Sequence, residues 1–262
     1  MIIPPKKLFL LDMDGTLYLD DHLFEGTIPF LTKVKEIGAR AVYLTNNSSR
    51  SVVAYVEKMN HLGIPCGAED FVTSVDATIA YLKKYYAHDK LYVLGTKSFY
   101  SQLESAGLSL TTTVEDDIAA LVMGFDTELT FQKLEDASIL LKRNIGYIAA
   151  NPDLVCPTAY GYVPDCGSVA EMLFHATGKT PIYMGKPESA MIDLALDRFQ
   201  VTKAQTALIG DRVYTDILAG LRAGIDTIMV LSGEGTIEEC NERNIHPTYI
   251  VNSISDVIPY LV

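Results

Sequence analysis

Two aspartates near the start of the chain have the type and spacing of a reactive carboxylate pair. Asp12 and Asp14 follow the apolar run Leu8–Leu11, and Gly15 comes directly after them. Glycine adopts left-handed backbone at little cost, so a sharp turn at Gly15 would bring both carboxylates to one place. Such a pair can bind a hard cation, or one carboxylate can act as a nucleophile while the other donates and accepts a proton. The alternative for either aspartate is an ordinary helix or turn cap.

Further polar side chains stand shortly after other apolar runs. They are Thr45, Asn46, Asn47, Lys186 and Asp211. Taken alone, hydroxyl and amide groups behind a strand are typical of a turn, and a lone lysine is usually solvated. Together with the two aspartates they would supply hydrogen-bond donors, a cation and a metal ligand.

Short β-rich runs alternate with longer helical patterns along nearly the whole chain. The runs cover residues 8–11, 41–44, 91–94, 120–123, 146–149, 181–184, 206–209 and 227–230. The patterns between them include residues 51–62, 131–143 and 188–199, where apolar residues recur at helical spacing. This alternation predicts an α/β fold with a Rossmann-like parallel-sheet core whose helices cover both faces. Because parallel strands end at one edge of their sheet, the polar groups behind four of these strands are expected to meet there.

The polar strand ends are unevenly distributed, which indicates an inserted domain. The stretch from Val75 to Lys179 has βα units of its own but none of the acidic or basic strand ends. We therefore expect a core formed by residues 1–74 and 180–262, with a second α/β domain inserted at residues 75–179.

The composition excludes several classes of partner. The 262 residues contain 21 Lys plus Arg against 33 Asp plus Glu, a formal net charge of −12. An acidic surface repels a nucleic-acid backbone, so we expect no nucleic-acid partner. No early apolar run approaches the roughly 18 residues of a membrane span, and the N-terminus lacks a signal-peptide pattern, so we expect a cytoplasmic protein without a membrane partner. The four cysteines form no CxxC pair and are expected to be free thiols.

Two glycine-containing segments match nucleotide-binding loops only in part. Gly233-Glu234-Gly235 begins like a dinucleotide loop, but Glu238 stands where the last glycine is required. Gly178-Lys179-Thr180 ends like a P-loop, but Leu173 stands where that loop requires its first glycine. Neither NAD nor ATP is therefore indicated as a cofactor.

Four motifs in a fixed order give a resemblance that no single motif would give. DMDGT at residues 12–16, LTNN at 44–47, MGKPE at 184–188 and IGDRVYTD at 209–216 resemble the haloacid dehalogenase superfamily of phosphohydrolases. The insertion resembles the large α/β cap of the NagD-like branch, which includes p-nitrophenylphosphatases and phosphoglycolate or pyridoxal phosphate phosphatases. The resemblance covers essentially the whole chain.

The resemblance implies a role for each matching residue. Asp12 resembles the nucleophile that becomes an aspartyl phosphate. Asp14 resembles the acid/base that protonates the leaving group and then activates water. Thr45 resembles the hydroxyl that holds the transferring phosphoryl group, and the Asn46 and Asn47 amides are further donors nearby.

The resemblance also implies a bound Mg²⁺ and a neutralising cation. Lys186 resembles the lysine that offsets the charges of Asp12 and the phosphoryl group. Asp12, Asp211 and the backbone carbonyl of Asp14 would hold Mg²⁺, which prefers oxygen ligands. Asp216 resembles the second acidic residue that supports the metal shell or the lysine.

Two proline-containing turns of the insertion resemble the cap loops that face the active site in the NagD-like branch. They contain Asp153 and Asp165, which are candidate substrate-binding residues. The alternative is two ordinary turns, one of which caps the helix that begins near Ser168.

The sequence thus predicts a Mg²⁺-dependent phosphatase that acts on small phosphorylated metabolites. A phosphomutase or phosphotransferase would use the same phosphoenzyme, with a second hydroxyl in place of water. A phosphometabolite-binding regulator without turnover is a third alternative. The physiological ester stays open among sugar phosphates, phosphoglycolate, pyridoxal phosphate and nucleoside monophosphates, and the oligomeric state stays open with a homodimer among the alternatives.

Overall fold

The computed structural model describes residues 3–158 and 160–261, and the chain divides into two compact units. The first, here the core unit, comprises Met1–Thr45, Val52–Val72 and Lys186–Val262. The second, here the inserted unit, comprises Asn46–Ser51 and Thr73–Gly185. The inserted unit therefore contains the expected insertion at residues 75–179, together with residues 46–51, 73–74 and 180–185 that were expected in the core.

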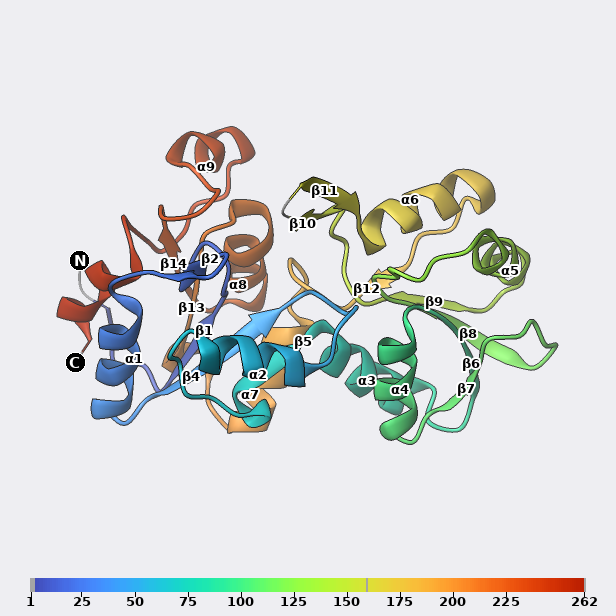
Figure 1. Ribbon diagram of the computed structural model, residues 1–262, viewed down its shortest axis with the longest axis horizontal. Helices are drawn as coiled ribbons and strands as arrows, with labels where there is room; N and C mark the ends of the chain where they lie inside the picture. The colour runs from blue at the N-terminus through green and yellow to red at the C-terminus, as the bar shows by residue number, and fades with distance from the viewer. Residues whose placement is uncertain (1–2, 159, 262) are drawn as a thin grey trace. The chain divides into compact units, whose positions relative to one another are not determined.

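The core unit is built on a six-stranded sheet in which the first and last parts of the chain lie side by side (Figure 1). Its strands, in spatial order, are β15 (Tyr249–Val251), β14 (Asp226–Val230), β13 (Thr206–Gly210), β1 (Leu8–Leu11), β4 (Arg40–Thr45) and β5 (Phe71–Thr73). β1 pairs in parallel with β13 and with β4, and β14 pairs in parallel with β13 and with β15. The prediction of a parallel α/β core is confirmed.

Helices and short turns form most of the connections of this unit. The helices are α1 (Thr27–Glu36), α2 (Val52–His61), α7 (Ala190–Phe199), α8 (Leu218–Ala223) and α9 (Ile237–Arg243). The 3-10 turns are η1 (Ala68–Asp70), η2 (Lys203–Gln205) and η4 (Ile254–Tyr260). A π-helical turn, η3 (Val213–Ile217), leads into α8, and a small hairpin of β2 (Tyr18–Leu19) and β3 (His22–Leu23) follows β1.

The central strands of the core sheet are fully buried. Every residue of β1 and of β13 is buried, as expected for parallel strands covered on both faces. Phe9, Leu11, Ile209 and Val230 belong to one apolar cluster with Phe30 of α1. Because a close-packed interior tolerates little displacement, this packing fixes the positions of the polar residues that follow β1 and β13.

The inserted unit has a sheet of its own. Its strands, in spatial order, are β12 (Ile182–Tyr183), β9 (Gly146–Ala149), β8 (Ile118–Met123), β6 (Lys90–Leu94) and β7 (Ser109–Thr111), all paired in parallel. Its helices are α3 (Ser74–Tyr85), α4 (Lys97–Ser105), α5 (Phe131–Leu141) and α6 (Cys166–Thr177). An antiparallel hairpin of β10 (Val155–Thr158) and β11 (Gly161–Pro164) precedes α6. A second apolar cluster, which includes Leu121, Leu140 and Leu173, forms the core of this unit.

β12 corrects one expectation about the core. The run at 181–184 is expected among the core strands, because Lys186 follows it. In the structure Ile182 pairs with Ile148 of β9, so β12 belongs to the sheet of the inserted unit. An apolar run predicts a strand, but the strand's partner depends on backbone hydrogen bonds that the run does not specify. Lys186 itself is the first residue of the next core segment.

Two expectations from composition can be compared with the structure. Cys66, Cys156, Cys166 and Cys240 are free thiols, as expected. Within residues 3–158 and 160–261, none of the helices combines the length and the apolar character that crossing a membrane requires.

Candidate active site

Two acidic residues of the site come from adjacent strands of the core sheet. Asp12 follows β1, Asp211 follows β13, and the register pairs Leu11 with Ile209 at the ends of these strands. The next strand after β1 in this sheet is β4 and the next after β13 is β14, and these two lie on opposite sides of the pair. Such a reversal opens a crevice at the carboxyl ends of the strands, where open α/β sheets bind ligands.

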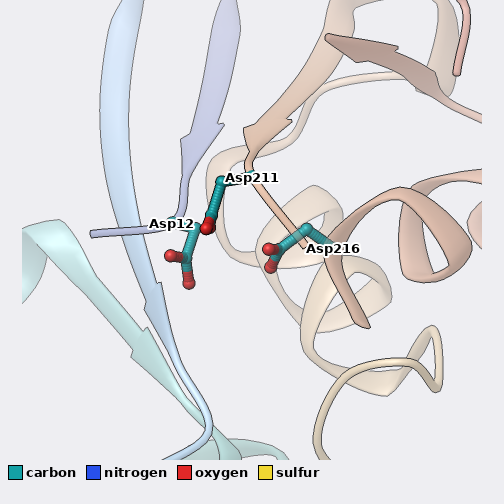
Figure 2. Close-up of side chains that lie close together, drawn as sticks. All are labelled: Asp12, Asp211 and Asp216. Atoms are coloured by element: carbon teal, nitrogen blue, oxygen red, sulfur yellow. The ribbon is translucent and has the colours of Figure 1, made fainter. Parts of the chain in front are cut away.

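A third carboxylate joins this pair from the π-helical turn η3. Asp12, Asp211 and Asp216 each offer an oxygen atom within 4.8 Å of the others, and the three side chains lie close together (Figure 2). Asp211 and Asp216 are 1% and 0% exposed. π-Helical turns are rare and occur frequently at functional sites. The arrangement concentrates negative charge where water has little access.

A buried lysine offsets part of this charge. Lys186 Nζ donates to Asp12 Oδ1 at 2.5 Å and to Asp216 Oδ1 at 2.6 Å, and the lysine is 4% exposed. Burial alone lowers the pKa of Lys186, but Asp12 and Asp216 outweigh it and raise the pKa above its usual value. Asp216 Oδ2 accepts from the backbone N–H of Arg212 at 3.1 Å. Lys186 is therefore a cation that joins two of the three carboxylates.

The loop that follows β14 in the sequence supports Asp211. The backbone N–H of Glu234 donates to Asp211 Oδ2 at 2.8 Å. A Cβ atom at Gly233 would overlap the same carboxylate oxygen, so only glycine fits there. In the sequence this segment resembles only an incomplete nucleotide loop, and nothing there indicates that it holds Asp211. The only feature of this loop that the sequence shows is a pair of glycines after an apolar run.

The donor set fits a hard divalent cation. Asp211 Oδ1 is buried and has no hydrogen-bond partner among the described residues. Burial, reinforced by the charge of Asp216, raises the pKa of Asp12 to about 8 and that of Asp211 to about 6. A desolvated carboxylate oxygen without a partner is costly, and a bound cation would remove that cost. Mg²⁺ takes oxygen ligands of this kind.

Asp14 lies on a tight turn next to the cluster. Gly15 has a φ of +79°, as its place after the aspartates predicted, and its N–H donates to the Tyr18 carbonyl at 2.8 Å. A Cβ atom at Gly15 would lie 2.5 Å from Asp211 Oδ2, so a side chain would collide there. The side chain of Asp14 is 55% exposed, and partial desolvation raises its pKa. Asp14 is thus more accessible to solvent than the other carboxylates of the site.

Thr45 and the two asparagines that follow it belong to different units. Thr45 ends β4 in the core unit and is buried. Asn46 belongs to the inserted unit, where its amide nitrogen donates to Asp153 Oδ2 at 3.0 Å. The carboxamide oxygen of Asn47 accepts from the backbone N–H and the hydroxyl of Ser49, at 2.9 and 2.8 Å. Both asparagine side chains therefore have partners within the inserted unit.

Asn46 also joins segments that are far apart in the sequence. Its carbonyl accepts from Ser74 Oγ at 2.7 Å and from Asn151 Nδ2 at 2.8 Å. A Cβ atom at Gly185 would lie 2.6 Å from Asn46 Oδ1. Asn46, Ser74 and Gly185 all stand at or next to points where the chain passes from one unit to the other. This network could not be predicted from the sequence, because no spacing links its members.

Asp165 is the N-cap of α6. Its Oδ1 accepts from the Cys166 N–H at 2.5 Å, and the residue is 4% exposed. Burial raises the pKa of Asp165 to about 7, although the hydrogen bond from Cys166 acts in the opposite direction. The helix starts slightly before the position near Ser168 that the sequence suggested. A substrate contact of Asp153 or Asp165 stays a prediction.

The inserted unit also contains a cavity of about 650 Å³ near the carboxyl end of β6. Among the residues that line it are Thr96, Lys97, Tyr100, Glu128 and Lys133. Lys133 Nζ donates to Asp126 Oδ2 at 2.7 Å and to the carbonyls of Gly95 and Glu128 at 3.0 and 3.1 Å. Since an ammonium has three protons, this lysine is fully engaged within its own unit. The carboxylate cluster of the core unit therefore stays the candidate active site.

Comparisons with known proteins agree with this geometry. A family model for haloacid dehalogenase-like hydrolases matches residues 9–109, and a second HAD hydrolase-like model matches residues 183–257. Acid sugar phosphatase from Staphylococcus haemolyticus is 32% identical over 97% of this chain and 96% of its own. The structure of 4-nitrophenylphosphatase from Thermotoga maritima has 36% identity and a TM-score of 0.90, with 97% of each chain covered. Glycerol phosphate phosphatase from Mycobacterium tuberculosis, in complex with magnesium, has 28% identity and a TM-score of 0.87 over 95% of this chain and 75% of its own.

Fold and site together define an α/β protein with a parallel-sheet core and an acidic cluster at the switch point of that sheet. The chain belongs to the haloacid dehalogenase-like hydrolases, in the NagD-like branch of phosphatases. The resemblance given by the order of the four motifs is confirmed.

Proposed function

We propose that this chain is a Mg²⁺-dependent phosphatase that hydrolyses small phosphate monoesters through an aspartyl phosphate on Asp12. The observation that carries the proposal is Lys186, which binds both Asp12 and Asp216 beside the Asp211 oxygen that has no partner in the described part of the chain. A phosphate ester and a carboxylate nucleophile repel each other, so their reaction needs preorganised positive charge at the nucleophile. Relatives named for acid sugar phosphatase, 4-nitrophenylphosphatase and glycerol phosphate phosphatase activity support the substrate class.

The reaction would proceed in two displacements at phosphorus. In the first, an Asp12 oxygen attacks phosphorus, the bond to the ester oxygen breaks, and Asp14 gives its proton to the departing alkoxide. Lys186 keeps Asp12 aligned, and the Thr45 hydroxyl donates to a phosphoryl oxygen. In the second, Asp14 takes a proton from water, the water oxygen attacks phosphorus, and the bond to Asp12 breaks. Inorganic phosphate leaves, and Asp12 and Asp14 return to their starting forms.

The carboxylates of Asp12 and Asp211 and the backbone carbonyl of Asp14 would hold Mg²⁺. When bound, the ion supplies positive charge against the phosphoryl oxygens. Asp216 bonds to Lys186 with one oxygen and to a backbone N–H with the other. Its part in the reaction is therefore to position the lysine.

The test is turnover of p-nitrophenyl phosphate, with and without Mg²⁺, by the wild type and by Asp12→Asn. An amide is not an equivalent nucleophile, so we expect kcat to fall below about 1% of wild type. Asp21→Asn, the same change at an exposed residue of the core unit, is the matched control. After acid quench, mass spectrometry of the wild type should find a phosphoryl group on the peptide that contains Asp12. Retained turnover in Asp12→Asn, or phosphorylation elsewhere, would overturn the proposal.

The products separate hydrolysis from transfer to an acceptor. We expect inorganic phosphate as the phosphorus product, in the same yield with and without added acceptor alcohol. A phosphorylated acceptor formed in place of inorganic phosphate would favour a phosphotransferase instead.

A further inference from the structure

Lys58 brings a positive charge to the edge of the candidate active site. It stands in the last turn of α2, and its Nζ atom lies 3.9 Å from Asp14 Oδ2. The same atom lies 4.2 Å from the centre of the Tyr18 ring. The motifs found in the sequence do not include this lysine, since it stands between the second and third of them.

Tyr18 fixes the place of the lysine. Tyr18 is 1% exposed, and its carbonyl accepts from the Gly15 N–H at 2.8 Å within the turn that carries Asp14. An ammonium above an aromatic ring is attracted by the negative face of the ring. The buried ring and the turn are thus tied together, and Lys58 contacts the ring while facing the carboxylate.

Asp14 needs such a partner more than the buried aspartates do. Its side chain is 55% exposed, whereas Asp211 and Asp216 are buried and accept from backbone N–H groups. Lys58 places a positive charge 3.9 Å from the Asp14 carboxylate. An exposed side chain samples several rotamers, but proton transfer requires the carboxyl group to lie within hydrogen-bond reach of the reacting oxygen.

We propose that Lys58 is a positioning residue that orients the Asp14 carboxylate for proton transfer in both steps of the reaction. The inference rests on the proposed function, in which Asp14 is the acid/base. A solvent-exposed ion pair adds little to stability, so removing this one should change the folding equilibrium only slightly. The competing account is that Lys58 binds the substrate directly. It predicts that removing Lys58 lowers kcat/KM by the same factor for every ester.

The leaving group distinguishes these two accounts. An alkoxide needs the proton of Asp14 to depart, whereas p-nitrophenolate departs with little help. For Lys58→Met we expect kcat/KM to fall about threefold to tenfold with an alkyl phosphate and less than about twofold with p-nitrophenyl phosphate. Lys58→Arg keeps the charge and the ring contact, and it should restore the wild-type ratio. Lys35→Met, the same change at an exposed residue of α1, is the matched control and should alter neither value.

A double-mutant cycle tests whether Lys58 acts through Asp14. In an Asp14→Ala background, Lys58→Met should change kcat/KM by less than about 1.5-fold, because the group that it orients is absent. Thermal denaturation checks folding, and Lys58→Gln replaces Lys58→Met if the methionine variant is unfolded.

Three results would overturn the inference. They are equal losses of kcat/KM with both esters, a rise in KM alone, or a loss of kcat/KM in the Asp14→Ala background as large as in the wild type. Failure of the proposed function looks different, because the wild type itself would then release no phosphate from either ester.

Discussion

The aspartates of the site differ in their bonding partners, and the difference separates their chemistry. Asp216 bonds to Lys186 and to a backbone N–H, so both of its oxygens are engaged. Among the described residues, Asp211 keeps one buried oxygen without a partner, which suits a metal ligand. Asp12 bonds to Lys186 through Oδ1, and its side chain is 18% exposed. In the proposed reaction, this partly exposed carboxylate beside Lys186 is the one that attacks phosphorus.

Replacing Lys186 by methionine should destabilise the protein as well as stop turnover. The change leaves Asp12 and Asp216 close together without their shared cation, and breaking a buried ion pair costs about 3–5 kcal/mol. Denaturant titration without added Mg²⁺ measures the loss in the free energy of unfolding. The double variant Lys186→Met/Asp216→Asn removes one of the two unpaired carboxylate charges. It should therefore be more stable than Lys186→Met but equally inactive. A double variant no more stable than the single one would contradict this account.

The cluster itself could be predicted from the sequence, but its supports could not. Asp12 and Asp211 stand behind apolar runs, and Lys186 belongs to a motif in the same order. Glu234 supports Asp211 through a backbone N–H, which any residue except proline offers, so its identity carries no signal. Lys58 looks like any solvated lysine on a helix until the fold brings it to Asp14.

At the scale of elements, local pattern predicted the strands better than it predicted their partners. The expected runs at 8–11, 206–209 and 227–230 are strands of the core sheet, whereas the run at 181–184 yields β12 of the other sheet. Apolar character is a local property, but sheet membership depends on backbone hydrogen bonds with distant strands. For the same reason, the hydrogen bond from Asn46 to Asp153 could not be foreseen, and a substrate contact of Asn46 stays a prediction.

The N-cap of α6 should make stability depend on pH. Burial raises the pKa of Asp165 from 3.8 to about 7, so the folded state favours the protonated carboxyl group. A group with a raised folded pKa contributes stability that is fully present below the unfolded pKa and is lost as pH rises through the folded pKa. The wild type should therefore lose this contribution between about pH 4 and about pH 7.

Asp165→Asn should remove that dependence. Asparagine keeps an oxygen to cap the Cys166 N–H, but it places no charge in the buried site. Relative to wild type, the free energy of unfolding of the variant should rise by about 1–3 kcal/mol from roughly pH 5 to pH 8. Denaturant titrations at both pH values measure this change, and Asp89→Asn at an exposed residue of the inserted unit is the control. The same difference at both pH values would show that Asp165 does not titrate in this range.

At the scale of the whole molecule, the net charge of −12 bears on both partners and metal. A cytoplasmic location and the lack of nucleic-acid and membrane partners stay predictions from charge and hydropathy, as does a homodimer among the oligomeric states. The same excess of acidic groups means that added salt stabilises the chain in general by screening. A specific Mg²⁺ site must therefore be separated from that general effect.

Mg²⁺ should stabilise the folded chain beyond screening, because only folding brings Asp12 and Asp211 together. A ligand at roughly 100 times its Kd adds about 2.7 kcal/mol to the stability of the state that binds it. We expect the thermal midpoint of the wild type to rise with Mg²⁺ at constant ionic strength. Asp211→Asn should lose most of this rise, and Asp21→Asn should keep it. An equal response in all three proteins would leave only general screening.

We expect the two units to have different functions. The inserted unit would select the ester, and the core unit would perform the reaction. The acidic cluster, Lys186 and Thr45 all belong to the core unit, whereas Asp153 belongs to the inserted unit. Contacts with the part of a substrate that does not react can still favour the transition state. p-Nitrophenyl phosphate lacks the polar groups of the natural candidates, so it should depend little on such contacts.

Asp153→Ala should therefore change the ranking of natural esters more than the rate with p-nitrophenyl phosphate. Over a panel of sugar phosphates, phosphoglycolate, pyridoxal phosphate and nucleoside monophosphates, we expect kcat/KM ratios to shift by about tenfold. With p-nitrophenyl phosphate, kcat/KM should stay within about threefold of wild type. Asn46→Ala removes the amide that bonds to Asp153, so it should alter the ranking in the same direction if orientation of this carboxylate matters. An unchanged ranking in both variants would mean that the pair only holds the turn in place, and that specificity arises elsewhere.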